Sequence, residues 1–221
     1  MIVLPRLYAI VDAGRFAAAK SPPVAMTGFA RELLAAGVTL FQYRNKNGSL
    51  VEMLSQAREL RRVAASGMLR LQGVSAEDQV RLVMNDRADL CLAAGFNAVH
   101  VGQDDISPEA ARRVVGPERW VGVSTHNPEQ VSQADQQPVD YIAVGPVFAT
   151  ASKINPDPVI GLEGVRRARA LTRKPLVAIG GITRANCRAV IQAGADSVAV
   201  ISDLLREPGR AAQEFLKLLA G

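Results

Sequence analysis

The chain has 221 residues, of which 48% are hydrophobic and 21% charged, which suits one well-buried core and argues against disorder and against two ordinary enzyme domains. No uncharged apolar run reaches the roughly 18 residues that cross a bilayer. The net charge is +5 with only 5% aromatic residues, so we expect a single domain over residues 1–221 that binds small anions, with no membrane and no nucleic-acid partner.

The chain begins with MIVLPRLYAIVD, which is typical of a strand and lacks the basic segment, apolar stretch and cleavage site of a secretion signal. Cys91 and Cys187 stand far apart, with no CxxC pair and no histidine-rich neighbourhood. This spacing favours neither a disulfide framework nor a zinc site. We therefore expect a cytoplasmic protein whose two thiols pack inside helices.

Short β-branched runs alternate with segments of helical periodicity along the whole chain, in eight pairs. The predicted strands are Leu7–Asp12, Thr39–Arg44, Arg81–Asn85, Ala98–Gly102, Trp120–Ser124, Tyr141–Gly145, Leu176–Gly180 and Ser197–Ser202. The predicted helices are Ala25–Ala36, Leu50–Ala65, Asp86–Ala94, Pro108–Val115, Pro128–Asp135, Leu162–Leu171, Arg184–Ala193 and Gly209–Leu219.

Eight βα units in this length predict an α/β fold, a single and compact (β/α)8 TIM barrel. Ser107, Asn127 and Thr183 stand at predicted helix starts, where their side chains can cap free backbone amides. The competing layout is a doubly wound sheet, which often carries GxGxxG after its first strand. Here the first strand ends in VDAGR, which is no such fingerprint.

Two connections are long, Ser66–Val80 and Pro146–Gly161. The first enters a strand at the face of the barrel that serves stability, and we have no functional interpretation of it. The second leaves a strand at the carboxyl end, where barrel enzymes place their sites. Pro146–Gly161 is therefore a candidate active-site lid.

The second predicted strand ends in QYRNK, and its alternate residues share a face. Gln42, Arg44 and Lys46 should point to one side, and Tyr43 and Asn45 to the other. An arginine fork beside a lysine point charge suits a diphosphate. The alternative is a solvated strand end with no ligand.

Carboxylates follow the third and fourth predicted strands. Asp86 comes after one, and Asp104 and Asp105 after the next. Two carboxylates from adjacent strands, with phosphates and water, are a usual Mg²⁺ donor set. The alternative is that Asp86 caps a helix and that Asp104 and Asp105 begin a turn.

The loops after the seventh and eighth predicted strands carry Gly180-Gly181 and Ile201-Ser202. Barrels commonly bind a phosphate there through backbone amides. His100 lies inside an apolar strand, which favours a packing role over that of a base. His126 follows a strand end and either lines the pocket or belongs to a turn.

The ordered set QYRNK, ND, HVGQDD, GVSTHN, VGPVFATASK, VAIGGI and AVIS resembles the thiamine-phosphate synthase family over nearly the whole chain. This resemblance implies a Mg²⁺-dependent transferase that joins hydroxymethylpyrimidine diphosphate to thiazole phosphate. The products are thiamine phosphate and pyrophosphate. A pyrimidine carbocation is thought to form first and to be captured by the thiazole nitrogen. A homodimer is common in the family, but the oligomeric state cannot be read from the sequence.

Matched position by position, the resemblance implies roles for each motif. The pyrimidine diphosphate would contact Gln42, Arg44, Lys46, Asn85 and Ser124, and Mg²⁺ would bind Asp86 and Asp105. Lys153 would stabilise the departing pyrophosphate. The thiazole phosphate would contact Thr150, Ala151, Ser152, Gly181, Ile201 and Ser202. The catalytic group would be Arg44, Lys46, Ser124 and Lys153.

The match departs from the family at three places, one of which is the Ser66–Val80 connection, longer here than is usual. The family lid often reads PTxTK, whereas this chain has Ala149 in place of the proline and Ser152 in place of the second threonine. Asp104 stands where glutamate is common, so the choice of Asp105 as the metal ligand rests on register.

Two rival functions share the scaffold. A thiazole tautomerase would use a histidine near His126, and a phosphate-ligand sensor would keep the phosphate loops without catalysis. Retention of QYRNK, ND and Lys153 favours the diphosphate substrate. Other basic residues, such as Arg61, Arg62, Arg166 and Arg167, fall on predicted outer helices, where we expect them to be solvated.

Overall fold

The computed structural model describes residues 2–68, 80–150 and 157–220. Eight parallel strands form a closed barrel in sequence order, and β1 pairs with β2 on one side and with β8 on the other. This confirms the predicted (β/α)8 barrel. The strands are β1 (Leu7–Asp12), β2 (Leu40–Arg44), β3 (Arg81–Asn85), β4 (Ala98–Val101), β5 (Trp120–Thr125), β6 (Tyr141–Val144), β7 (Leu176–Ile179) and β8 (Ser197–Val200).

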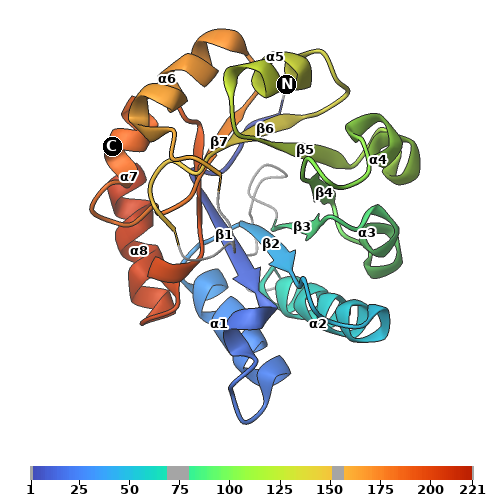
Figure 1. Ribbon diagram of the computed structural model, residues 1–221. Helices are drawn as coiled ribbons and strands as arrows, with labels where there is room; N and C mark the ends of the chain where they lie inside the picture. The colour runs from blue at the N-terminus through green and yellow to red at the C-terminus, as the bar shows by residue number, and fades with distance from the viewer. Residues whose placement is uncertain (1, 69–79, 151–156, 221) are drawn as a thin grey trace.

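Helices surround the barrel in Figure 1, each lying outside the strands that it connects. They are α1 (Pro22–Ala35), α2 (Leu50–Met68), α3 (Ala88–Ala94), α4 (Pro108–Val115), α5 (Pro128–Asp135), α6 (Gly161–Leu171), α7 (Cys187–Gln192) and α8 (Pro208–Leu219), with short 3-10 helices η1 (Ala13–Phe16) and η3 (Ser202–Leu204). Part of the long Ser66–Val80 connection is thus the end of α2, and residues 69–79 lie outside the described part.

Helices α4 and α5 have the bounds that the sequence predicted. The hydroxyl of Ser107 accepts a hydrogen bond from the amide of Ala110 at 3.2 Å, and the side chain of Asn127 accepts one from Gln130 at 2.9 Å. Each helix also has proline in its first turn. A capping oxygen and a fixed φ therefore define both starts.

Three predicted helix starts are off by two or three residues, and the first of them is that of α1, which begins at Pro22 rather than Ala25. Helix α3 begins at Ala88 rather than Asp86, because Asp86 has a left-handed φ of 62° that cannot belong to a helical turn. Helix α7 begins at Cys187 rather than Arg184. Asn186 bonds back to the amide of Thr183 at 2.8 Å, so Thr183 begins a separate turn and caps no helix.

Four predicted strands end one or two residues early, at Val101, Val144, Ile179 and Val200. After β4, the amide of Gly102 donates to the Asp105 carboxylate at 2.7 Å, which turns the chain away from the sheet. After β7, Gly180 has a φ of 101°, outside the range of a strand. The residues that leave the sheet are those that surround the barrel mouth.

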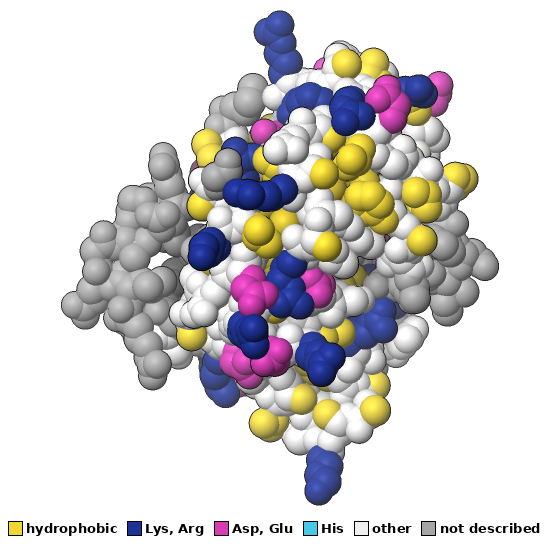
Figure 2. All heavy atoms as spheres, turned by 90° about the vertical axis from the view of Figure 1, so that its left-hand side faces the viewer, with side chains coloured by type: hydrophobic (Ala, Val, Ile, Leu, Met, Phe, Trp, Pro, Cys, Tyr) yellow, Lys and Arg dark blue, Asp and Glu magenta, His cyan; other side chains and the backbone are white. Residues whose placement is uncertain are grey.

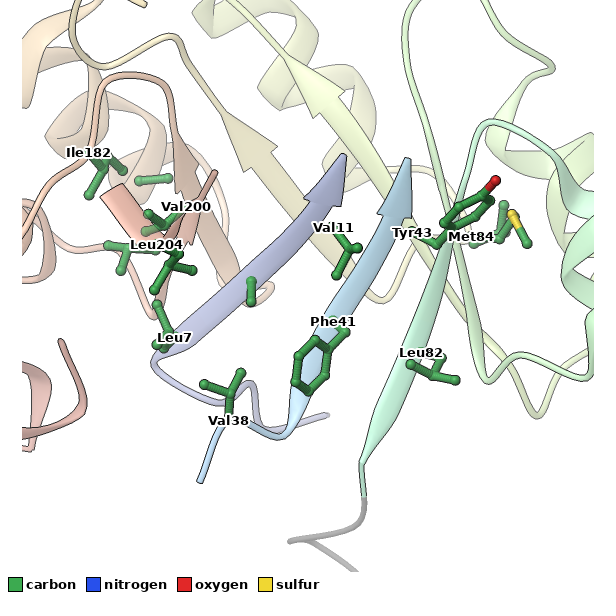
Figure 3. Close-up of a cluster of buried hydrophobic side chains, with 14 of the residues drawn as sticks. Leu7, Val11, Val38, Phe41, Tyr43, Leu82, Met84, Ile182, Val200 and Leu204 are labelled. Atoms are coloured by element: carbon green, nitrogen blue, oxygen red, sulfur yellow. The ribbon is translucent and has the colours of Figure 1, made fainter. Parts of the chain in front are cut away.

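Alternate residues of each strand face two different cores. Leu7 and Val11 of β1 point outward to the helices, together with Phe41 of β2 and Met84 of β3 (Figure 3). The intervening Tyr8 and other inward-facing residues belong to a second cluster that fills the barrel. The helices cover the outer face of each strand, and the barrel interior covers the inner face. The strands are therefore continuous apolar runs in the sequence, because both faces are buried.

Both cysteines are buried free thiols, Cys91 within α3 and Cys187 at the start of α7, and the sequence predicted that they pack inside helices. Among the helices described here, none is long and apolar enough to cross a membrane.

Candidate active site

A cavity of about 630 Å³ opens at the carboxyl ends of the strands. Most of the predicted site residues line it. They are Gln42, Arg44, Lys46, Asn85, Asp86, Asp105, Ser124, Thr150, Gly181, Ile201 and Ser202. The remaining predicted residues, Ala151, Ser152 and Lys153, lie outside the described part of the chain. Residues that are scattered in the sequence meet here because every strand ends at the same mouth.

The end of β2 has the two faces that its alternation predicts. Gln42, Arg44 and Lys46 face the cavity. On the other side, the Tyr43 hydroxyl donates to Gln56 of α2 at 2.7 Å, and Asn45 donates to the same oxygen at 3.2 Å. The strand is therefore held from outside by α2, while its polar cavity face is presented to a ligand.

Both cations on this face have carboxylate partners. Nη1 of Arg44 lies 2.7 Å from the Asp12 carboxylate, and Nζ of Lys46 lies 2.5 Å from that of Asp86. Asp12 is buried at the end of β1 and also accepts from the amide of Gly14 at 3.2 Å. It thus orients Arg44 from behind. We did not predict this role of Asp12 from the sequence. The signal that could have indicated it is that Asp12 stands at the carboxyl end of a predicted strand.

Asp86 and Asp105 both line the cavity, and their carboxylates interact electrostatically. Burial raises the pKa of Asp86; Lys46 lowers that pKa, and the neighbouring Asp105 raises it further. The alternative in which Asp86 caps α3 is wrong, because the cap position is Arg87 and no side chain caps this helix. Asp104 lines the cavity as well, but Asp105 is the carboxylate that acts on Asp86.

The floor of the cavity holds buried polar groups. His100 has Nδ1 3.0 Å from the Tyr141 hydroxyl and Nε2 2.9 Å from the Ser124 hydroxyl. Burial lowers the pKa of His100 to about 4, so the ring is neutral at pH 7. Burial also raises the pKa of Tyr8 and of Tyr141, and both phenols stay protonated. His100 is a hydrogen-bonded interior residue, as its sequence context predicted.

Asn85 has an unused donor on this floor. Within the described residues, its Nδ2 is the one buried side-chain nitrogen or oxygen without a hydrogen-bond partner. Leaving a buried donor unpaired costs about 1–3 kcal/mol, so such a group is often kept for a ligand. Asn85 lines the cavity, and its amide can donate to a bound molecule there.

Close backbone contact shapes the other side of the mouth. Gly181 has a φ of 62°, and a Cβ atom on it would lie 2.5 Å from the carbonyl oxygen of Ala149. The amide of Phe148 donates to the Gly180 carbonyl at 3.0 Å, which holds the loop after β6 against the end of β7. Glycine at position 181 is therefore required by both conformation and space.

The candidate lid has two ends that are bound to each other. Ile160 donates to the Pro146 carbonyl at 2.9 Å, and Gly161 donates to that of Val147 at 3.1 Å. The predicted lid thus leaves and returns at one place beside β7. Residues 151–156, at its centre, lie outside the described segments.

His126 lines the cavity near this loop. Its Nδ1 lies 2.6 Å from the Gly145 carbonyl, and Nε2 lies 3.5 Å from the Asp157 carboxylate. Because a carbonyl oxygen can only accept, Nδ1 is the donor in its contact with Gly145. His126 therefore lines the pocket, the first of the two roles that its sequence position left open.

Within residues 2–68, 80–150 and 157–220, no group of three or more His, Cys, Asp and Glu side chains is placed to hold a metal ion. The pair Asp86 and Asp105 is the arrangement suited to a hard cation that keeps water or substrate oxygens as its other ligands.

Comparison with known proteins gives one consistent answer. A family model described as thiamine monophosphate synthase matches residues 7–204. The thiamine-phosphate synthase of Koribacter versatilis is 62% identical over 98% of this chain and 96% of its own length. That of Agrobacterium fabrum is 39% identical over 91% of this chain and 86% of its own length.

A solved structure is similar over the same extent. The thiamine phosphate pyrophosphorylase of Pyrococcus furiosus has a TM-score of 0.80 and 29% identity, covering 97% of this chain and 95% of its own. A structure named native KDPGal has a TM-score of 0.72 at 16% identity, over 100% of this chain and 98% of its own. The latter likeness shows the barrel fold alone.

Proposed function

The chain belongs to the thiamine monophosphate synthase family, and from this premise we propose that its barrel mouth joins hydroxymethylpyrimidine diphosphate to thiazole phosphate. The products are thiamine phosphate and pyrophosphate. The chain is thus a transferase of thiamine biosynthesis. The observation that supports this assignment of the cavity is that an edge with Arg44 and Lys46 lies opposite a glycine-lined edge, across one polar floor.

The first edge belongs to β2, β3 and β4, and we assign it to the diphosphate. Arg44 offers a planar fork and Lys46 a point charge. Asp12 holds the guanidinium at 2.7 Å from behind, so that Arg44 needs little reordering when it binds phosphate oxygens. Lys153, outside the described residues, remains the proposed partner of the departing pyrophosphate.

The second edge belongs to the loops after β6, β7 and β8, which lie opposite in the closed barrel. We assign it to the thiazole phosphate. Gly181, Ile201 and Ser202 line the cavity there, as does Thr150. Gly181 has no side chain to keep a ligand from the backbone, and backbone amides at such loops commonly bind phosphate. Ala151 and Ser152 remain proposed contacts.

The first edge also fits Mg²⁺. Its described charges are Arg44 paired with Asp12, Lys46 paired with Asp86, and the further carboxylates of Asp104 and Asp105. With all four carboxylates ionised, such an edge has an excess of two negative charges and would repel a diphosphate. Asp86 and Asp105 would hold the ion, which when bound supplies the positive charge that the diphosphate oxygens need as the leaving group departs.

The protein itself orients and protects the reactants. The Ser124 hydroxyl and the unpaired Nδ2 of Asn85 can bond the pyrimidine, while the second edge places the thiazole nitrogen toward it. Holding two reactants in line removes much of the entropic barrier. If a pyrimidine carbocation forms, the same arrangement puts its nucleophile in place before the diphosphate leaves.

The decisive experiment supplies both phosphorylated halves with Mg²⁺ and measures pyrophosphate and thiamine phosphate. We expect both products in equal amounts. A thiazole tautomerase would isomerise a thiazole carboxylate phosphate without the pyrimidine substrate, and a sensor would bind both ligands without product. Binding of both halves with no pyrophosphate would refute the synthase assignment.

A further inference from the structure

Five polar side chains from five strands form a continuous chain of hydrogen bonds across the barrel interior. In order they are Gln42 of β2, Tyr8 of β1, Tyr141 of β6, His100 of β4 and Ser124 of β5. The consecutive distances are 2.9, 3.2, 3.0 and 2.9 Å. We call the three central residues, Tyr8, Tyr141 and His100, the relay. The family assignment gives the relay no role.

The first half of the chain has one direction. The amide nitrogen of Gln42 can only donate, so the Tyr8 oxygen accepts from it. Tyr8 is 2% exposed, and the Tyr141 oxygen is the acceptor that the structure places beside its hydroxyl. A buried hydroxyl that donates to nothing is costly. Either hydroxyl can be the donor in this bond, and we assign the donor role to Tyr8.

The second half follows from the first. Tyr141, 1% exposed, has used its oxygen to accept, and its own proton points to Nδ1 of His100. A neutral imidazole has one donor and one acceptor nitrogen. Nε2 then carries the proton and donates to the Ser124 hydroxyl. The proton of Ser124 is left to point into the cavity, which Ser124 lines.

We infer that the relay makes the Ser124 hydroxyl a hydrogen-bond donor, and the Gln42 amide oxygen an acceptor, toward the bound pyrimidine. This inference rests on the proposed function, which places a pyrimidine in the cavity. The relay residues touch no reacting atom in this account. They are positioning residues that determine specificity, because they set the polarity of two groups that do contact the substrate.

The polarity selects between two pyrimidine types. An aminopyrimidine, as in thiamine, presents an N–H donor beside a ring-nitrogen acceptor, which matches an acceptor from Gln42 and a donor from Ser124. An oxopyrimidine presents a carbonyl acceptor beside a ring N–H donor, which opposes both. A site that forms hydrogen bonds with the polar groups of its substrate binds an analogue with reversed donors and acceptors much more weakly, because buried polar groups of the site are then left without partners.

The direction of the relay can be read by NMR without any substrate. The chain contains two histidines, His100 and His126, so ¹⁵N-histidine labelling gives two sets of ring signals, assigned with a His126→Gln variant. We expect His100 to be neutral with the proton on Nε2. A proton on Nδ1, or averaging between the two nitrogens, would reverse or abolish the direction and would overturn the inference.

Selectivity provides the second test. Binding of the aminopyrimidine diphosphate and of its oxo counterpart is measured with Mg²⁺ by competition, for wild type and two variants. Tyr141→Phe interrupts the relay, and we expect the preference for the amino form to fall by about tenfold or more. Tyr43→Phe is the control on the outer face: Tyr43 is about as buried as Tyr141, and its variant loses the hydrogen bond to Gln56, whereas Tyr141→Phe loses those to Tyr8 and His100.

In the control, we expect the preference to stay within about twofold of wild type. Equal changes in the two variants would mean that only packing matters, and the relay would be rejected. If Tyr141→Phe does not fold, Tyr8→Phe interrupts the same chain one bond earlier. The result is independent of turnover: wild type that binds the amino form with an Nε2-protonated His100 but makes no product sustains the relay and refutes the synthase.

Discussion

The ion pair of Arg44 with Asp12 shows how a single buried carboxylate holds a cation in place beside the cavity. The guanidinium lies 2.7 Å from Asp12, whose side chain is 8% exposed, so the fork is held before any phosphate arrives. Hydrogen bonds to charged groups contribute about 1.5–3 kcal/mol each. The cavity-facing nitrogens of Arg44 are therefore preorganised rather than spread over many rotamers.

Arg44→Ala should raise KM for the pyrimidine diphosphate by about tenfold or more while leaving KM for the thiazole phosphate nearly unchanged, because the two edges are separate. Asp12→Asn should have a smaller effect in the same direction. Arg62→Ala, which removes an exposed partner of Glu59 on α2, is the matched control and should change neither constant. Steady-state kinetics with each substrate varied in turn measures all three.

Asp86→Asn should remove most activity and most Mg²⁺ dependence with little loss of folding. The substitution keeps the shape of the side chain and relieves its repulsion from Asp105, while a neutral amide is a poorer ligand for a hard cation. Mg²⁺ titrations of turnover, beside thermal unfolding curves, test this. Turnover at the wild-type level would contradict the metal assignment.

At the scale of elements, the loops rather than the strands determine the second edge. The loop after β6 is hydrogen-bonded to the end of β7 through Val147 and Phe148, and Gly180 and Gly181 permit this close contact. Both glycines have positive φ, at 101° and 62°. The shape of the second edge therefore depends on packing between two loops and not on one side chain.

Gly181→Ala should weaken binding of the thiazole phosphate and lower the free energy of unfolding by about 1–3 kcal/mol, since its Cβ would meet the Ala149 carbonyl at 2.5 Å in a left-handed conformation. Gly28→Ala is the control within helix α1. No atom lies within 4 Å of a Cβ there, and the change should stabilise by about 0.5–1 kcal/mol. Denaturant unfolding and titration with the thiazole phosphate compare the two variants. Equal changes in the free energy of unfolding for Gly181→Ala and Gly28→Ala would contradict the close-contact argument.

At the scale of the whole molecule, the +5 charge is distributed rather than concentrated on the face in view. Figure 2 shows acidic side chains beside basic ones over the side that carries α6, α7 and α8. Arg166 and Arg167 both contact Glu163 there, and Arg184 and Arg210 both contact Glu214. Exposed pairs of this kind contribute little to stability, and they leave no wide basic surface on this face.

Charge at the cavity mouth predicts how ligands stabilise the fold. Because the first edge is negative without an added cation, the diphosphate alone and Mg²⁺ alone should each raise Tm only slightly. Together, at about 100 times Kd, they should add about 2.7 kcal/mol, or roughly 5–10 °C for a chain of this size. Thermal unfolding under the four conditions measures this, and a full shift with the diphosphate alone would contradict the proposed charge balance.

Much of this arrangement could be predicted before any coordinates, and the exceptions have identifiable causes. The alternation in QYRNK correctly assigned Gln42 and Tyr43 to opposite faces, because strand periodicity is a local property. The start of α3 was wrong because Asp86 takes a left-handed φ, which its neighbours in sequence do not reveal. Asp12 was missed because its role depends on Arg44, across the pairing of β1 with β2.

The sequence by itself determined the number and order of the βα units and which residues stand at the carboxyl ends of the strands, since periodicity and turn residues act over a few positions. Only the tertiary structure decided which of those residues meet. Tyr8 and Tyr141 are 133 residues apart and share a hydrogen bond, because closure of the barrel brings distant strands around one interior. The sequence was enough to predict the net charge and a preference for small anions. The carboxylate partner of each cation and the direction of the relay depend on the closure of the barrel.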